Sequence, residues 1–194
     1  RSNVSVLDEN SNKDAAIVST QRDLIAGEVS KDIARRKLIP TDILEAHDSG
    51  AIHFHDMDYI IQPMFNCCLI NLEDMLTNGT VINGKKIDTP KSFQVACTVT
   101  TQIIAQVASG QYGGQSINGI DRILAPFVRK SYEKILNNVI EEQVEIYGME
   151  PNMEKAREIA WKRTRKEVKD GIQTIQYQIN TLMTTNGQSP FVTL

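Results

Sequence analysis

The 194-residue sequence lacks several features that define whole classes of protein. It has no apolar run of about 18 residues, so it predicts no transmembrane helix. Its net charge is only −3, which argues against nucleic acid or an anionic membrane as a partner. Hydrophobic residues make up 41% and charged residues 23%, a globular balance that excludes a disordered or collagen-like chain.

Cysteine is also scarce, with Cys67, Cys68 and Cys97 as the three examples. An odd number with two adjacent members is not a secreted disulfide framework, and it indicates a reducing, cytoplasmic compartment. The spaced Cys and His pairs of a structural zinc site are missing, so the sequence predicts no metal site.

Both ends indicate a piece of a longer protein. The sequence opens with Arg1-Ser2 and closes with Phe191–Leu194, which has the pattern of a buried strand stopped partway. The length suits one domain or one large part of a bigger domain. We therefore expect residues 1–194 to form a single partial domain.

The hydrophobic pattern of the sequence predicts a mainly helical chain with a few short strands. Apolar positions at helical spacing predict helices over 13–36, 42–48, 90–108, 117–147 and 151–185. Pro126 predicts a kink or break in the fourth of these helices. Short strands are expected over 52–55, 64–70 and 191–194, and a hairpin over 81–87, where Asn83-Gly84 has the composition of a two-residue turn.

One helical segment carries a heptad-like seam, which predicts packing along another helix and favours a dimer. The seam residues are Val168, Ile172, Ile175, Ile179 and Leu182.

Cys67 and the two histidines are the first candidates for chemistry. A thiol in an apolar segment is usually inert packing, but one that faces a pocket can donate hydrogen or form a disulfide. On a strand, Cys67 and Cys68 would point to opposite faces. His53 and His55 would share one face about 7 Å apart, where they could bind a metal, steer a proton or orient an anion. Two hydrogen-bonded surface histidines are the plainer interpretation.

Three further features each leave two interpretations open. Gly113-Gly114 is not a P-loop and is either an anion site before a helix or a simple turn. Lys91, close to Lys85 and Lys86, either contacts a phosphate or belongs to a solvated edge. Gln102 either reads a nucleobase edge or satisfies backbone groups.

Several long, ordered motifs together resemble the class III, or anaerobic, ribonucleoside-triphosphate reductases. The resemblance covers residues 13 to 194. It is carried by the runs Ile52–Tyr59, Met64–Cys67, Pro90–Ser92, Thr100–Ser109, Tyr112–Gly114, Ile120-Asp121, Leu124–Val128 and Gly187–Phe191.

The resemblance implies a part of a ten-stranded α/β barrel of the glycyl-radical enzyme type. Enzymes of this family convert ribonucleoside triphosphates to deoxyribonucleoside triphosphates. A glycyl radical passes to a cysteine, and the thiyl radical takes the 3′ hydrogen of the ribose. A second cysteine on the first barrel strand takes part in reduction, with formate or a thiol as the reductant. Cys67 matches that second cysteine, and Cys68 is then a packing neighbour.

The resemblance also assigns two binding sites. His53, His55 and Asn66 are expected to line the substrate pocket. Asp88, Lys91, Gln102 and Lys134 are expected to form the allosteric site for a Mg-dNTP or ATP effector, between helices over 90–147 and 151–185 at a homodimer interface.

The remaining machinery of the family has no counterpart in these residues. The ATP cone, the thiyl cysteine, the structural zinc site, the glycyl-radical loop and the site for the radical-SAM activase are therefore expected outside this chain, which we expect to be inactive alone. The alternative is a non-enzymatic helical module that dimerises through the 168–182 seam and binds nucleotide.

Overall fold

The structure is a computed structural model that describes residues 16–62, 64–148, 150–182 and 190–194. Its helices are α2 (Val18–Ile33) with a π-helical continuation η1 (Ala34–Leu38), α3 (Thr41–Asp48), the 3-10 turn η2 (Met57–Tyr59), α4 (Leu72–Thr77), α5 (Phe93–Ala108), α6 (Ile120–Tyr147) and α7 (Met153–Thr181). The strands are β1 (Cys68–Leu69), β2 (Thr80–Ile82), β3 (Lys85–Ile87), β4 (Gln115–Ser116) and β5 (Val192–Thr193). The expectation of a mainly helical chain with short strands is confirmed.

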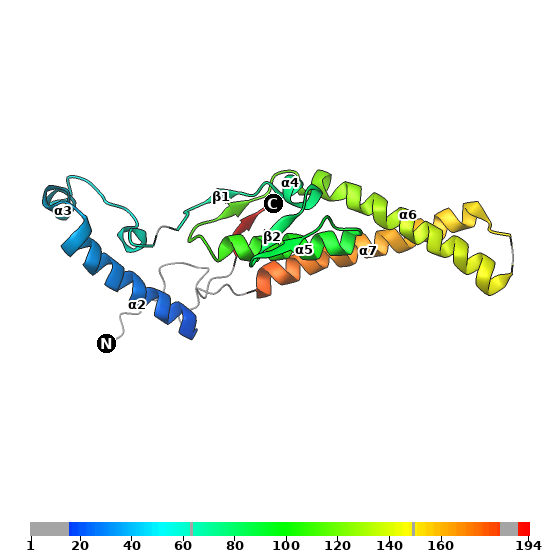
Figure 1. The fold of residues 1–194 in the computed structure, drawn as a ribbon, viewed down its shortest axis with the longest axis horizontal. Helices are drawn as coiled ribbons and strands as arrows, with labels where there is room; N and C mark the ends of the chain where they lie inside the picture. Colours follow the sequence, from blue (N-terminus) through cyan, green and yellow to red (C-terminus); the bar gives the residue numbers. More distant parts are fainter. Residues whose placement is uncertain (1–15, 63, 149, 183–189) are drawn as a thin grey trace.

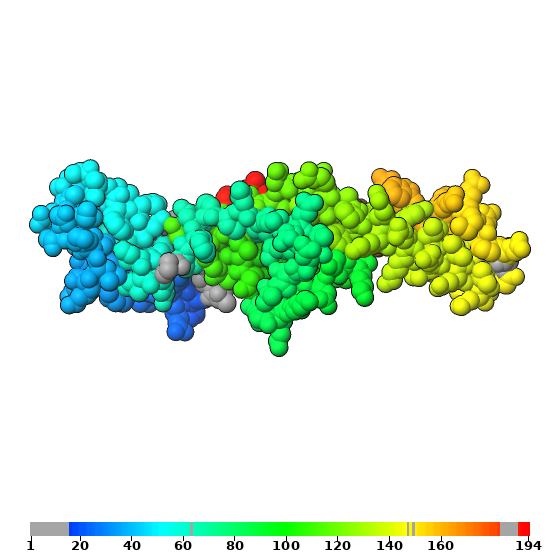
Figure 2. Space-filling model, turned by 45° about the horizontal axis from the view of Figure 1, so that its top comes forward, coloured from blue at the N-terminus to red at the C-terminus, as the bar shows by residue number. Residues whose placement is uncertain are grey.

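The molecule is elongated, with its elements arranged along the long axis (Figure 1). Helices α2 and α3 form one end, and α6 and α7 run back along each other to form the other end. The space-filling view shows the same order from blue to yellow (Figure 2). The short strands and α5 lie in the middle, where the C-terminus also ends.

Two small sheets occupy this middle region. β1, β4 and β5 form a parallel sheet in the order β1-β4-β5, with Cys68 opposite Gln115 and Gln115 opposite Val192. β2 and β3 form the expected antiparallel hairpin. Asn83 and Gly84 have φ of 49° and 73°, as a two-residue turn with two left-handed positions requires.

The main hydrophobic core lies where α5, α6 and α7 meet. The inner face of α5 follows its apolar spacing, because Phe93, Cys97, Thr100 and Ile104 are buried. Helix α7 approaches α5 closely at Gly171. A Cβ at that glycine would lie 2.6 Å from Cε1 of Phe93, so a larger residue would force the two helices apart.

The 168–182 seam packs along helices of this chain, which confirms the expected packing along another helix, while the dimer stays a prediction. Ile175 is buried in the main core, and Val168 and Ile179 pack against the same core. Ile172 is 49% exposed and is the member that remains open. The seam residues of α7 pack against α5, because α5 and α7 both also contact α6 and the three helices lie together. This removes the main support for a module that dimerises through the seam.

The strand predicted at 52–55 is absent, the one at 64–70 is shorter than predicted, and of the kink or break predicted at Pro126 the break is absent. Of 64–70, only Cys68–Leu69 is a strand. Helix α6 begins at Ile120 and continues without a break through Pro126. Pro126 lies in the second turn, where it removes one helical hydrogen bond of a long helix that also packs on α7. The helix end predicted at 186–187 lies outside the described residues.

Candidate functional site

The two adjacent cysteines differ in exposure. Cys68 is half-buried and packs against the main core, whereas Cys67 is exposed. Both line an open cavity of about 300 Å³ together with Gly114, Ser116 and Phe191. Cys67 lies just before β1, so the opposite faces expected of two strand residues stay a prediction. Cys67 therefore has both the access and the neighbouring space that a reacting thiol needs.

Two glycines bring the walls of this cavity together. A Cβ at Gly113 would collide with the backbone oxygen of Asn66. A Cβ at Gly114 would lie 2.7 Å from Cδ1 of Phe191, whose ring occupies that space. Both glycines thus allow close packing at the approach to β4. Helix α6 begins only at Ile120, so neither an anion site at its first turn nor a plain helix-to-helix turn describes this loop.

The thiols differ in their surroundings. Sγ of Cys67 lies 3.4 Å from Oδ1 of Asn66, which can accept its weak hydrogen bond. Burial, with a smaller contribution from Cys67, raises the pKa of Cys68. Burial and the carboxylate of Glu167 raise the pKa of Cys97 to about 12. Because the thiolate is the reactive form, Cys97 is a packing residue.

The two candidate histidines touch each other. Nε2 of His53 lies 3.1 Å from Nδ1 of His55, closer than the 7 Å spacing that a strand would give. The chain turns at this point because Asp56 adopts a left-handed conformation with φ of 54° and precedes η2. Nε2 of His55 lies 3.3 Å from Oδ1 of Asp56, so the two histidines have a carboxylate beside them.

Sequence reasoning missed the residue that joins this histidine segment to the thiol segment. Tyr112 donates a 2.6 Å hydrogen bond to Oδ2 of Asp56. The backbone N–H of Tyr112 donates to the oxygen of Phe65, two residues before Cys67. Asp56 and Tyr112 are 56 residues apart, and neither residue type nor spacing signals the contact. Phe191, the aromatic wall of the thiol cavity, was missed for the same reason.

The four expected effector residues are all exposed, but this chain brings only some of them together. Asp88 follows β3 and lies 3.9 Å from the ammonium of Lys86. Lys91 and Lys134 lie near the same end of α5, because α6 contacts residues 90 and 93 one turn before Lys134. Gln102 is nine residues further along α5 than Phe93, or about 13 Å along the axis.

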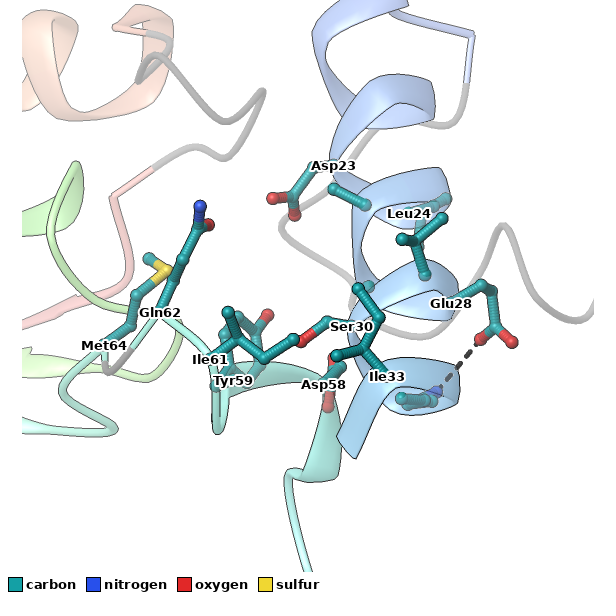
Figure 3. Close-up of a pocket in the computed structure, with 14 residues that line it drawn as sticks. Asp23, Leu24, Glu28, Ser30, Ile33, Asp58, Tyr59, Ile61, Gln62 and Met64 are labelled. Atoms are coloured by element: carbon teal, nitrogen blue, oxygen red, sulfur yellow. Dashed lines mark hydrogen bonds and ion pairs between the residues drawn. The ribbon is translucent and has the colours of Figure 1, made fainter. Parts of the chain in front are cut away.

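A further cavity, of about 340 Å³, lies between α2 and the segment that follows η2 (Figure 3). Leu24 and Ile33 line it from α2, and Ile61 and Met64 line it from the facing segment. Asp58 faces α2 at Gly27, where an added Cβ would make an ordinary contact at 3.5 Å. Nothing in the sequence pattern pointed to this cavity.

The described residues contain neither a membrane-spanning helix nor a cluster of metal ligands. No helix in that part of the chain is both long and apolar enough to cross a membrane. Within the same residues, no group of three or more His, Cys, Asp or Glu side chains is arranged to hold a metal ion.

The chain matches known proteins along its whole length. The family model for anaerobic ribonucleoside-triphosphate reductase matches residues 9–194. The chain is 49% identical over 194 residues to the protein of that name from Escherichia coli and 47% identical to that of Haemophilus influenzae. It is 43% identical over 195 residues to that of Enterobacteria phage T4.

These alignments cover 100% of this chain but only 26% of the two bacterial proteins and 31% of the phage protein. The chain thus spans roughly a quarter to a third of the length of these relatives, and the resemblance drawn from the sequence motifs is confirmed. This chain belongs to the anaerobic ribonucleoside-triphosphate reductase family.

Proposed function

We propose that the complete protein containing this chain reduces ribonucleoside triphosphates to deoxyribonucleoside triphosphates in the cytoplasm. The carrying observation is the family match from residue 9 to 194, at 43–49% identity to reductases over the full chain. In this proposal residues 1–194 form the first part of a ten-stranded α/β barrel. The parallel order β1-β4-β5 supports it, because parallel strands with helical connections are the units of such barrels.

Cys67 is the redox cysteine of this proposal. It is exposed beside a cavity, and its neighbour Cys68 packs into the core. A hydroxyl-bearing ribose fits a cavity that combines the thiol with the hydroxyl of Ser116 and the aromatic ring of Phe191. There Cys67 supplies hydrogen during reduction of the sugar, with formate or a thiol as the final reductant.

His53, His55 and Asn66 bind the substrate next to this thiol. Asn66 adjoins Cys67 and is held against Gly113, so its amide has a defined position. The histidines are connected to the same strand pair through Asp56 and Tyr112. Imidazole and amide groups can donate hydrogen bonds to hydroxyl and phosphate oxygens, which are the polar groups of a nucleotide.

The effector site is formed by Asp88, Lys91, Gln102 and Lys134 at a homodimer interface. The two lysines suit the phosphates of a Mg-dNTP or ATP effector, and the amide of Gln102 suits a base edge. The separation of Gln102 from the lysine pair along α5 supports a site that a second chain completes. Val95 and Thr98 are exposed on the same side of α5 as Gln102, which leaves room for that chain.

The glycyl radical, the structural zinc and the site that binds the radical-SAM activase belong to other parts of the complete protein. The described residues offer no ligand group for zinc, and they include no glycine placed beside Cys67 other than the two that serve close packing. When present, the radical supplies the hydrogen-abstracting species. The residues of this chain hold the nucleotide and supply the second thiol.

The test is a set of cysteine variants in the complete protein, assayed anaerobically for deoxyribonucleotide formation. We expect Cys67→Ser to lower turnover by more than about 100-fold while nucleotide binding persists, because a hydroxyl cannot replace the redox role of a thiol. The matched control is Cys97→Ala, which removes a thiol that is buried in the core. It should keep turnover within about threefold.

Cys68→Ser decides which thiol acts. Turnover that survives Cys67→Ser but is lost in folded Cys68→Ser would contradict the assignment of Cys67. A complete wild-type protein that forms no deoxyribonucleotide after activation would contradict the proposed function as a whole.

A further inference from the structure

Four side chains form a continuous row of polar contacts between the histidine segment and the loop before β4. His53 Nε2 lies 3.1 Å from His55 Nδ1, and His55 Nε2 lies 3.3 Å from Asp56 Oδ1. The other carboxylate oxygen, Oδ2 of Asp56, accepts the 2.6 Å hydrogen bond from the hydroxyl of Tyr112. The row therefore runs from His53 through His55 and Asp56 to Tyr112, and the Asp56 carboxylate is its one acidic group.

The carboxylate decides where the protons of the neutral histidines lie. The side chain of ionised Asp56 can only accept, so Oδ1 at 3.3 Å attracts an N–H and favours a proton on Nε2 of His55. Nδ1 of neutral His55 is then an acceptor and requires a proton on Nε2 of His53. Both rings are consequently Nε2–H tautomers. Nδ1 of His53 remains as an unprotonated acceptor, for which the described part of the chain shows no partner.

Tyr112 and Asp56 are themselves held in place. The ring of Tyr112 stacks on that of Tyr59, with centroids 4.1 Å apart and planes 6° from parallel. Its backbone N–H is bonded to Phe65, which ties it to the segment of Cys67. Asp56 has a left-handed backbone, and unlike Asn83 it has no hairpin turn that requires one. Such a conformation persists when the surrounding contacts fix it.

We propose that Asp56 and Tyr112 are positioning residues that fix the tautomers of His55 and His53, so that Nδ1 of His53 is free to accept a proton from a hydroxyl of the bound nucleotide. In that step the O–H bond breaks, an N–H bond forms at Nδ1, the oxygen keeps the electron pair, and His53 becomes an imidazolium. This inference rests on the proposed function, since it takes His53 and His55 as part of the substrate pocket. The hydroxyl of Tyr112 bonds to Oδ2 of Asp56, so Oδ1 remains available to face His55. The Asp56 carboxylate thus faces Tyr112 with one oxygen and His55 with the other. Neither residue needs to touch the nucleotide.

The first test reads the tautomers directly, without an activity assay. Histidines labelled with ¹⁵N in the complete protein are measured by NMR near pH 8, where ordinary imidazoles are neutral, and are assigned through His53→Gln and His55→Gln. We expect Nε2–H signals for both rings. In Asp56→Asn, the amide nitrogen of the new side chain can donate to Nε2 of His55, so His55 should change to the Nδ1–H tautomer.

Two results of this test would overturn the inference. One is an Nδ1–H tautomer or a doubly protonated ring for either histidine in the wild-type protein. The other is an unchanged tautomer of His55 in folded Asp56→Asn. Should that variant fail to fold, Tyr112→Phe replaces it, because loss of the tyrosine hydroxyl frees Oδ2 and should give His55 a mixed tautomer signal.

The second test separates turnover from binding. We expect Asp56→Asn to lower kcat by about 100-fold or more, the lower range of a lost acid–base contribution, with KM within about threefold. Tyr112→Phe should lower kcat by about tenfold, because the carboxylate remains. Tyr132→Phe is the matched control, since it removes the same atom from a tyrosine that packs on Trp161 of α7, and it should change neither constant.

A kcat within about threefold of wild type in folded Asp56→Asn would overturn the inference. A wild-type protein without reductase activity would instead contradict the proposed function. The tautomer measurement would still decide whether Asp56 orders the two histidines.

Discussion

The carboxylate of Asp56 has the largest effect on the pKa of Tyr112. The hydrogen bond of the phenol to that carboxylate, followed by burial and the negative charge of Asp56, raises the pKa of Tyr112 from 10.0 to about 12. The folded state thus holds this proton more tightly than the unfolded chain does. The resulting stabilisation is complete below about pH 10 and is lost as the pH rises from 10 to 12.

We therefore predict that Tyr112 ionises about two pH units above an ordinary tyrosine. The measurement is the phenolate absorbance of the complete protein during an alkaline titration, with the curve of Tyr112→Phe subtracted. The difference curve should have its midpoint near pH 12, and in Asp56→Asn the same curve should shift down toward 10. A wild-type midpoint near 10 would contradict the close contact with Asp56.

At the level of single residues, the sequence predicts local alternation but not distant contacts. Cys67 and Cys68 differ in burial, as an alternating pattern predicts, but both line the same cavity. His53 and His55 touch through their ring nitrogens because residues 53–55 do not form the expected strand. No periodicity encodes the contact between Asp56 and Tyr112, because it depends on how two remote segments meet.

At the level of elements, the first turn of α5 is held by side chains from two other helices. The N–H of Phe93 donates to Oγ of Ser131 on α6, at 2.8 Å. The N–H of Gln94 donates to Oε1 of Glu167 on α7, at 3.1 Å, and Ser131 donates to the same oxygen. Ser92 caps the N–H of Val95. These bonds satisfy helix N-terminal donors that otherwise lack partners.

We predict that Ser131→Ala destabilises the complete protein by about 1–3 kcal/mol, because it leaves the buried N–H of Phe93 without an acceptor. Urea unfolding followed by circular dichroism provides the measurement. Ser109→Ala is the control, since that hydroxyl donates to the oxygen of Ala105, which also accepts a backbone N–H. It should cost less than about 0.5 kcal/mol. Equal losses in the two variants would contradict this view of the junction.

The elements themselves were largely predictable where local pattern decides them. Asn83-Gly84 specified the hairpin, and the apolar spacing specified the inner face of α5. The strand predicted over 64–70 shrank to Cys68–Leu69, and Phe65 and Leu69 are 77% and 86% exposed. Apolar composition alone does not predict which residues will pair with another strand. The pairing depends on β4 and β5, which are distant from β1 in the sequence.

At the level of the whole molecule, the effector site makes a testable prediction. In the complete protein, calorimetric titration with dATP, dGTP, dTTP and dCTP in the presence of Mg²⁺ should show binding of at least one nucleotide. Micromolar affinity corresponds to roughly −8 kcal/mol. We expect Lys91→Ala and Gln102→Ala each to weaken it by about tenfold or more, because each removes a polar contact to the nucleotide.

The control for this titration is Lys37→Ala, which removes an exposed positive charge from η1, at the α2 and α3 end of the elongated molecule (Figure 1). It should leave affinity unchanged. Unaltered binding in both Lys91→Ala and Gln102→Ala, in a folded dimer, would contradict the effector assignment. Binding that weakens equally in all three variants would indicate general electrostatic attraction.

The sequence by itself determined the family, most of the helices and the hairpin, because these depend on ordered motifs and on local periodicity. Tertiary structure alone decided three other matters. It directed the 168–182 seam to α5 of the same chain, joined Asp56 to Tyr112, and placed Phe191 over Gly114 beside the thiol. Each of these depends on packing between segments far apart in the chain, and neither spacing nor residue type records which segments will meet.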